Sequence, residues 1–462
     1  MMQQIDWAKS DRGEPDSPFM GGAVKRKLKL TFHSESLESA AGEDLVAIVA
    51  LRGLAQIDEV VAADTAKGEI PHLIIGDFSP DHDFTDVGLI GKDCEIRTGI
   101  QFPRQWLEMS KKLTGKSDYN DPEVRNMLSL ILMARAHHQI DHDLLITLSP
   151  ELLRNRFLLF IKDTNPCTPC EAIKILGLYL RYRKNYIFDV SNGVKYFLDK
   201  GFFYWLLTRH RLPRMWKYFS ACVYSGQQRK DGISDLGGSI LTRSVRALEA
   251  RDEIGYQFYS TQSNNTRDAM MYHFDYLTLL LSGIFDSMAS VARRVYSIRK
   301  PNERNSNFRS EKYLNALRKN GGDRLYEVVT HQDFIDLMTM LTALRNTIHG
   351  ANLRTLAYKE PVKEEKSFVA LEKTIANAVW DASARYSSPN EWGIFQSHEI
   401  LFEPYTYSIT LIRECYKFIN SIANATDVVK LFPAGSTPRM LVSPPSDSLF
   451  NKFTRKRVHI LG

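Results

Sequence analysis

The sequence predicts an α/β sheet domain in its N-terminal half and an all-α helical bundle in its C-terminal half. Short apolar stretches alternate with helix-patterned segments as far as about residue 185, which is typical of a mostly parallel sheet covered by helices. From Arg267 onward, apolar residues recur at helical spacing over long segments. The length of 462 residues fits two or three domains of ~150 residues each.

In the N-terminal half, strand and helix patterns differ clearly in their period. Lys27–Phe32 alternates charged and apolar side chains, as a half-buried strand does. Gly42–Ala62 repeats its apolar residues at helical spacing instead. The other expected strands are His72–Ile75, Asp143–Thr147 and Phe157–Lys162, and the other expected helices are Trp106–Leu113, Pro122–His137, Pro150–Arg156 and Pro169–Tyr182.

In the C-terminal half, the longest expected helix is Ala269–Ile298, and a second amphipathic helix covers Gln332–His349. The remaining expected elements are the helices Lys312–Lys319, Leu371–Ala384 and Pro404–Ala423 and the strand Glu399–Phe402. We therefore expect a helical bundle with a small β insertion over residues 266–430.

Changes in composition suggest where these domains begin and end. Residues 1–26 are polar and unpatterned, so we expect a mobile arm ahead of an α/β domain over residues 27–225. Residues 226–265 are rich in Gly, Ser, Gln and Asn and are predicted to form a linker with a short helical piece. Residues 431–462 contain four prolines and end in basic residues, which indicates a basic tail that does not fold alone.

The composition excludes several classes of protein. Hydrophobic residues make up 44% and charged residues 25%, but no apolar run approaches the ~18 residues that span a bilayer. The five cysteines are irregularly spaced, and the pair Cys167 and Cys170 has no second pair to complete a zinc site. We expect a cytoplasmic protein with reduced thiols, no membrane contact and no cofactor.

The most informative stretch is Leu341–Gly350 in the second long helix. On a helical wheel its apolar residues form one stripe, and Arg345 and His349 lie one turn apart beside that stripe. Asn346 lies further round, and Gly350 is a natural helix end. A guanidinium, an amide and an imidazole therefore follow one edge of the buried face, where a neighbouring helix or subunit would pack.

This Arg345-Asn346…His349 pattern resembles the HEPN superfamily, many of whose members are ribonucleases of toxin–antitoxin and antiviral defence systems. The resemblance covers roughly residues 267–425 and places Asp286, on the preceding long helix, as a polar partner. It implies a homodimer and metal-independent RNA cleavage, in which a 2′-hydroxyl attacks the neighbouring phosphorus and leaves a 2′,3′-cyclic phosphate. His349 would act as general acid or base, Arg345 would hold the phosphorane oxygens and Asn346 would orient one of them.

A structural interpretation of the same residues stays open. Three residues separate Arg345 from His349, whereas catalytic family members usually have four to six. In the structural interpretation, Arg345, Asn346 and His349 only hold their helix against the preceding long helix, and Asp286 forms an ion pair with Arg345.

Residues 134–174 resemble the last third of a PIN-like domain, a fold whose nucleases hold Mg²⁺ or Mn²⁺ with carboxylates. The resemblance rests on the strand Asp143–Thr147 and on the helix start Thr168-Pro-Cys-Glu171. Where that family has a carboxylate two residues after Thr147, this sequence has Ser149. We therefore expect a PIN-like domain without a metal site, serving as a platform for RNA or for the other half.

A basic, aromatic-rich segment adds a candidate RNA surface. Residues 171–230 carry 12 Lys or Arg and three acidic residues, an excess larger than the net charge of +6 on the whole chain. Single-stranded nucleic-acid sites combine such cations with stacking rings. The residues expected to bind RNA are Arg209, Arg211, Arg214, Trp216 and Lys217. The alternative is an aromatic core layer with a basic, solvated rim.

Two further clusters contain metal-ligand residue types. Residues 77–86 hold four carboxylates and a histidine, and His137, His138 and His142 lie near two aspartates. We interpret the first as a solvated loop and the second as a helix end. The sequence thus favours an RNA-binding protein and possible endoribonuclease over a non-catalytic dimeric scaffold and over a metal-dependent nuclease.

Overall fold

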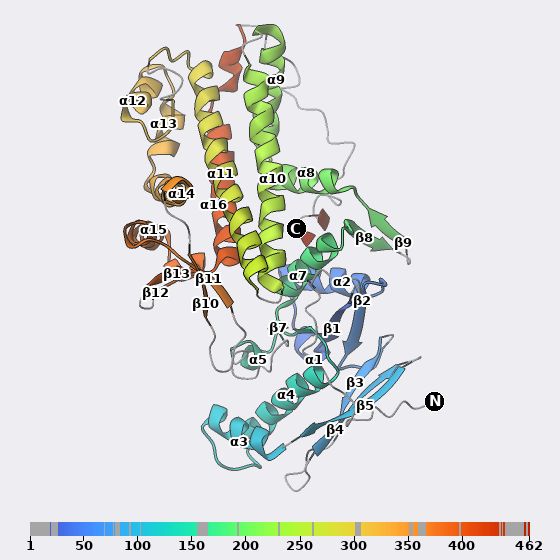
Figure 1. Cartoon of the computed structure of the whole chain (residues 1–462). Helices are drawn as coiled ribbons and strands as arrows, with labels where there is room; N and C mark the ends of the chain where they lie inside the picture. The colour runs from blue at the N-terminus through green and yellow to red at the C-terminus, as the bar shows by residue number, and fades with distance from the viewer. Residues whose placement is uncertain are drawn as a thin grey trace. The chain divides into compact units, whose positions relative to one another are not determined.

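The structure is a computed structural model in which two compact units are described. The described residues are 19 and 26–462, except 69, 77, 79–83, 92–93, 102, 155–164, 192–193, 230–231, 261–262, 301–305, 351–353, 359–365, 397–398, 434–435, 437, 439–456 and 459–460. The α/β unit runs to Phe197 and includes the last two residues, and the helical unit runs from Leu198 to Val458 (Figure 1).

The α/β unit contains a seven-stranded sheet in the order β5-β4-β3-β2-β1-β6-β7. The strands β3, β2, β1, β6 and β7 are parallel, and β4 and β5 form an antiparallel hairpin at one edge. The bounds are β1 Leu28–Phe32, β2 Val60–Asp64, β3 His72–Ile75, β4 Phe84–Gly91, β5 Cys94–Gln101, β6 Leu144–Ile146 and β7 Asn165–Cys167. The chain order reverses on either side of β1, which makes the carboxyl ends of β1 and β6 a topological switch point.

Helices between the strands explain the parallel pairing, since each parallel connection needs a crossover segment. They are α1 Ser34–Leu37, α2 Gly42–Leu54, α3 Pro103–Thr114, α4 Pro122–Gln139, α5 Pro150–Arg154 and α7 Pro169–Tyr182, followed by the hairpin β8 Ile187–Ser191 and β9 Val194–Phe197. Leu30 and Phe32 of β1 are completely buried, as is Ile131 of α4. The Thr168 and Glu171 side chains form a reciprocal capping box at the start of α7, which gives both residues a structural role.

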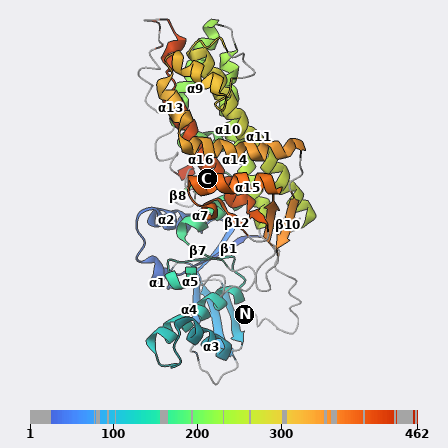
Figure 2. The ribbon, with the colours of Figure 1, turned by 90° about the vertical axis from the view of Figure 1, so that its left-hand side faces the viewer.

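The helical unit is built on two long helices, α10 Ile233–Tyr259 and α11 Asn264–Val295, which run side by side (Figures 1 and 2). The helix α14, Gln332–Gly350, crosses them, since it is seen end-on in Figure 1 and lengthwise in Figure 2. The other helices are α8 Lys200–Arg211, α9 Met215–Arg229, α12 Glu311–Lys319, α13 Asp323–Thr330, α15 Lys373–Tyr386 and α16 Pro404–Ala425, with the short 3₁₀ helices η3 Pro389–Trp392 and η4 Val428–Leu431. Phe274, Leu281 and Phe285 of α11 are buried in the core of this unit.

A four-stranded antiparallel sheet, in the order β10-β11-β13-β12, is inserted among these helices. Its strands are β10 Arg354–Tyr358, β11 Lys366–Ala370, β12 Ile394–Gln396 and β13 Ile400–Phe402. One of these strands, β13, was expected from the sequence as Glu399–Phe402. The missed strands are three to five residues long, which is too short for an alternating pattern to stand out in the sequence.

The coarse fold class is confirmed, because the structure combines a seven-stranded sheet with helices and a region of many helices. The domain limits differ from expectation in two ways. The compact units divide after Phe197, so the basic aromatic segment α8–α9 belongs to the helical unit. Residues 226–265, expected as a linker, contain the 27-residue helix α10.

The glycines of this stretch have a packing role. A Cβ on Gly237 of α10 would lie 2.7 Å from the Cβ of Cys222 on α9, and a Cβ on Gly226 of α9 would lie 2.7 Å from the Cβ of Ser234. The small residues that suggested a linker therefore allow α9 and α10 to approach closely.

Some expected segments cannot be compared. The strand Phe157–Lys162, most of the arm 1–26 and most of the tail 431–462 lie outside the described residues. Within the described part of the chain, no helix combines the length and apolar character that crossing a membrane requires.

Candidate functional site: a pocket with two arginines in the helical unit

The structure brings Arg345 of α14 next to Asp286 of α11. Arg345 Nη1 lies 3.3 Å from Asp286 Oδ2, and the two side chains are 37% and 45% exposed. The apolar stripe of α14 sets this position: Phe334 packs edge-on against Phe285 of α11, and Leu341 and Leu344 are buried. Arg345 follows this stripe, so its side chain emerges at the border of the α11–α14 contact.

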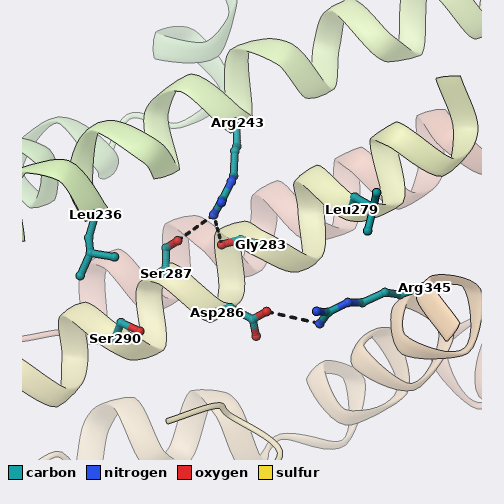
Figure 3. Close-up of a pocket in the computed structure, with 8 residues that line it drawn as sticks. All are labelled: Leu236, Arg243, Leu279, Gly283, Asp286, Ser287, Ser290 and Arg345. Carbon is teal, nitrogen blue, oxygen red and sulfur yellow. Dashed lines mark hydrogen bonds and ion pairs between the residues drawn. The ribbon is translucent and has the colours of Figure 1, made fainter. Parts of the chain in front are cut away.

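A cavity of about 350 Å³ lies at this border, between α10, α11 and α14 (Figure 3). Residues of all three helices line it: Leu236, Arg243, Leu279, Gly283, Asp286, Ser287, Ser290 and Arg345. Two guanidinium groups, one carboxylate and two hydroxyls therefore surround one space. The lining carries a net positive charge, which favours an anionic ligand.

Arg243 of α10 was not a predicted site residue, and it holds a fixed position in the pocket. Its Nη1 donates hydrogen bonds to the carbonyl oxygen of Gly283 at 2.7 Å and to Ser287 Oγ at 2.8 Å. A Cβ on Gly283 would lie 2.9 Å from Nη1 and 3.0 Å from Cζ of Arg243. The absence of a side chain at residue 283 thus lets the guanidinium lie directly on α11. A glycine in the middle of a long helical pattern was the one signal in the sequence.

Of the four residues expected to be catalytic, Arg345 and Asp286 are the two that the structure brings together. Asn346 is exposed on α14, next to the buried Thr347. His349 belongs to the last turn of α14, but its side chain lies outside the described residues.

The exposure of the Arg345–Asp286 pair decides how it is interpreted. An ion pair in contact with water contributes about 0–1 kcal/mol. By contrast, Arg251 and Asp252 of α10 are 6% and 1% exposed and 2.6 Å apart, with the Tyr204 hydroxyl donating to the same carboxylate. The second pair is a core element, whereas the first remains accessible to a ligand that competes for either partner.

The basic aromatic segment contains both a buried aromatic layer and exposed cations. Phe203, Tyr204 and Tyr218 are buried in the core, while Arg214 and Lys217 are exposed. The expected RNA-binding residues Arg209 and Trp216 lie together: the Arg209 guanidinium is 4.5 Å from the centroid of the Trp216 ring and 5.3 Å from that of Trp205.

Arg211, also expected to bind RNA, ends α8 and is held by the bundle. Its backbone carbonyl accepts a hydrogen bond from Asn420 Nδ2 of α16 at 2.9 Å, and its side chain is partly buried. Of the predicted RNA-binding residues, Arg214 and Lys217 are therefore the exposed ones, whereas Arg209, Arg211 and Trp216 are partly buried.

In the α/β unit, the switch point is filled by mutually bonded polar groups. Thr147 Oγ1 lies 3.0 Å from His33 Nδ1 and from Ser36 Oγ, and it accepts from the Ser149 backbone N–H. Ser149 Oγ donates to Glu151 at 2.9 Å. Burial lowers the pKa of His33, which favours its neutral form at pH 7.

Asp64, at the carboxyl end of β2, is a carboxylate that the sequence analysis did not single out. It is buried and pairs with Arg52 of α2 at 3.0 Å. Across the described part of the chain, no cluster of three or more His, Cys, Asp or Glu side chains is arranged to hold a metal ion. The acidic loop 77–86 lies largely outside the described residues.

The histidines near Asp143 surround a buried threonine of β1. Thr31 Oγ1 lies 2.8 Å from His137 Nδ1 and 2.9 Å from His142 Nδ1. Burial lowers the pKa of His142 to about 4 and that of His137 well below its usual value, so both rings stay neutral. Burial also raises the pKa of Asp143 to about 6, against the opposing charge of Arg26.

Comparison with protein-family models, with curated proteins and with solved structures found no match to this chain.

Proposed function

We propose that the helical unit binds RNA at the pocket between α10, α11 and α14 and cleaves it without a metal ion. One observation carries the proposal: Arg345 and Asp286, contributed by two different helices, meet half-exposed at the edge of an open cavity. A carboxylate that only joins two helices can be buried, as Asp336 is where it pairs with Arg385 of α15, whereas both partners of the Arg345–Asp286 pair stay in contact with water.

The proposed reaction is an internal transesterification. The ribose 2′-oxygen loses its proton to a base and attacks the adjacent phosphorus, and the 5′-oxygen of the next nucleotide leaves with a proton from an acid. The products are a 2′,3′-cyclic phosphate and a free 5′-hydroxyl. His349 supplies the acid–base function, because imidazole titrates near neutral pH.

Arg345 then stabilises the negative charge that develops on the phosphorane oxygens, since its planar fork matches two oxygens at once. Asn346, exposed on the next position of α14, orients one of these oxygens. In this proposal Asp286 is the counter-ion of Arg345 in the free protein. A homodimer, as in the HEPN superfamily, would bring two such sites to one cleft, and the PIN-like α/β unit would present RNA to it without a metal of its own.

The test is cleavage of an end-labelled RNA of mixed sequence by the full chain, in EDTA and in Mn²⁺. We expect cleavage that survives EDTA, leaves cyclic-phosphate ends and is lost in His349→Ala. The matched control is His331→Ala, because His331 precedes the same helix and its side chain is 63% exposed. Equal loss in both variants, or cleavage that requires Mn²⁺, would contradict the proposed site.

The second candidate is a non-catalytic interaction module, which the existence of the Arg345–Asp286 contact itself favours. A module of this kind would show no cleavage under either condition. Overexpression separates the two cheaply: a nuclease of the toxin or defence type should slow growth, and Arg345→Ala should relieve the effect, whereas a scaffold should do neither.

A further inference from the structure

We propose that the pocket holds a phosphate group between Arg243 and Arg345, with Arg243 as a second phosphate-binding residue contributed by α10. This inference deepens the proposed function and rests on it for the identity of the ligand, a single-stranded RNA backbone. The two arginines lie on separate helices and both line the same cavity. A phosphate group matches two guanidinium groups that line one cavity, because it offers negative charge and several oxygens to their N–H donors.

Arg243 is preorganised for binding an anion. Arg243 Nη1 donates hydrogen bonds to the Gly283 carbonyl oxygen and to Ser287 Oγ, and these two bonds fix the plane of the guanidinium (Figure 3). A guanidinium has five N–H donors, so the bonds that fix it leave others for a ligand. Since the side chain is already ordered, little rotamer entropy is lost when a phosphate binds.

Gly283 of α11 leaves the room that the Arg243 guanidinium occupies. Any larger residue at position 283 would push Nη1 and Cζ away, because its Cβ would lie 2.9 and 3.0 Å from them. Glycine in a helix interior costs about 1 kcal/mol relative to alanine. The position of Arg243 is thus obtained at the expense of helix stability, which is a common pattern at binding sites.

The charges and hydroxyls of the pocket lining also suit a phosphate group. Asp286 neutralises one of the two arginines in the free protein, which leaves one positive charge facing the cavity. Ser287 and Ser290 lie one turn apart on α11 and add hydroxyls to the lining. An incoming phosphate would replace the carboxylate as the partner of Arg345 while Arg243 keeps its place on α11.

The experiment measures binding rather than cleavage. A fluorescein-labelled, single-stranded 2′-O-methyl RNA is titrated with the full chain, and its anisotropy gives Kd at several salt concentrations. The probe lacks the 2′-hydroxyl, so it cannot be cleaved. For Arg243→Ala we expect Kd to rise about tenfold, and the slope of log Kd against log salt to fall by about 0.7, the value for one phosphate contact with a single strand.

Two further variants separate binding from packing. Arg246→Ala is the matched control, because Arg246 is exposed on the same helix and does not line the pocket; its Kd should stay within about twofold. Gly283→Ala keeps both arginines but displaces the Arg243 guanidinium. It should weaken binding while leaving the melting temperature unchanged or higher, because alanine favours the helix.

The outcomes distinguish this inference from the proposed function. If RNA is cleaved but Arg243→Ala and Arg246→Ala bind equally, the phosphate site is wrong and the nuclease stands. If nothing is cleaved but binding depends on Arg243 and Gly283, the site is correct as an anion site and the nuclease proposal fails. Unchanged binding in Gly283→Ala would overturn the role of the glycine and of the Arg243 position.

Discussion

The pocket of the helical unit and the switch point of the α/β unit both gather polar side chains, but they use them differently. At the switch point, His33, Ser36 and Thr147 bond to one another; His33 and Thr147 are buried and Ser36 is partly buried. In the pocket, Arg345 and Asp286 make one weak contact and remain half-exposed. Polar groups that satisfy each other stabilise a fold, whereas polar groups left accessible around a cavity can exchange partners with a ligand.

The largest expected difference between the two regions concerns activity. Arg345→Ala should lower the rate of RNA cleavage by about 10²-fold or more, because it removes a donor aimed at the charge of the transition state. The stability of the helical unit should change by less than about 1 kcal/mol, because the ion pair is exposed. Single-turnover cleavage and urea unfolding measure the two effects. Loss of stability without loss of activity would mean that the pair is structural.

The converse substitution in the α/β unit is Thr147→Val. It keeps the shape of the side chain but leaves His33 Nδ1 and the Ser149 N–H without their partner, which should cost about 1–3 kcal/mol. Slowed cleavage is not expected. Hydrogen exchange of the amides of β1 and β6 reports the loss, with Ser39→Ala, an exposed hydroxyl of the same unit, as the control. A comparable effect in both variants would contradict the buried network.

Acid should destabilise the α/β unit through its buried histidines. Burial lowers the pKa of His142 from about 6.5 in the unfolded chain to about 4 in the folded protein. Between pH 6.5 and 4 the unfolded chain therefore binds more protons than the folded protein, and the free energy of unfolding decreases as the pH is lowered. His137 acts in the same direction, and Asp143, whose folded pKa rises to about 6, opposes both below pH 6.

His142→Gln isolates one of these contributions. The substitution removes one titrating group. The slope of the unfolding free energy against pH should therefore decrease by about 1.4 kcal/mol per pH unit between pH 6 and 4. Hydrogen exchange of β1 and β6, corrected for the intrinsic exchange rate, measures this slope. An unchanged slope would show that His142 is already protonated in the folded protein.

The smallest effect is expected for Asp286→Asn. Stability should change by less than about 1 kcal/mol, while binding of the 2′-O-methyl RNA should tighten severalfold, because a negative charge leaves the pocket. Asp336→Asn is the matched control: this carboxylate also pairs with an arginine of another helix, Arg385, at 2.6 Å, but it is buried. The control should lose stability and leave RNA binding unchanged. Weaker binding in Asp286→Asn would mean that the carboxylate contacts the ligand.

Sequence patterns predicted those elements whose burial produces a regular period. The stripe of α14 and the apolar face of α11 were both predicted, and their crossing places Asp286 beside Arg345, the contact that the structural interpretation of the motif predicted. The helix α10 was predicted only as a short helical piece within a linker, because small residues such as Gly237, which allows close packing on α9, resemble a linker. The role of Arg243 could not be predicted from local sequence patterns, because it depends on a contact with Gly283, forty residues later in the chain.

The close approach of α9 and α10 also makes it possible to measure how often these two helices separate. The Cys222 thiol is completely buried, and its Cβ would touch any side chain placed at Gly237. An alkylating reagent can reach this sulfur when the two helices separate. The rate at which Cys222 gains a mass tag equals the opening rate when labelling outpaces reclosing, and is proportional to the fraction of open protein when it does not. A slower labelling rate of Cys222 in the presence of RNA would show that an occupied pocket keeps α10 packed against α9.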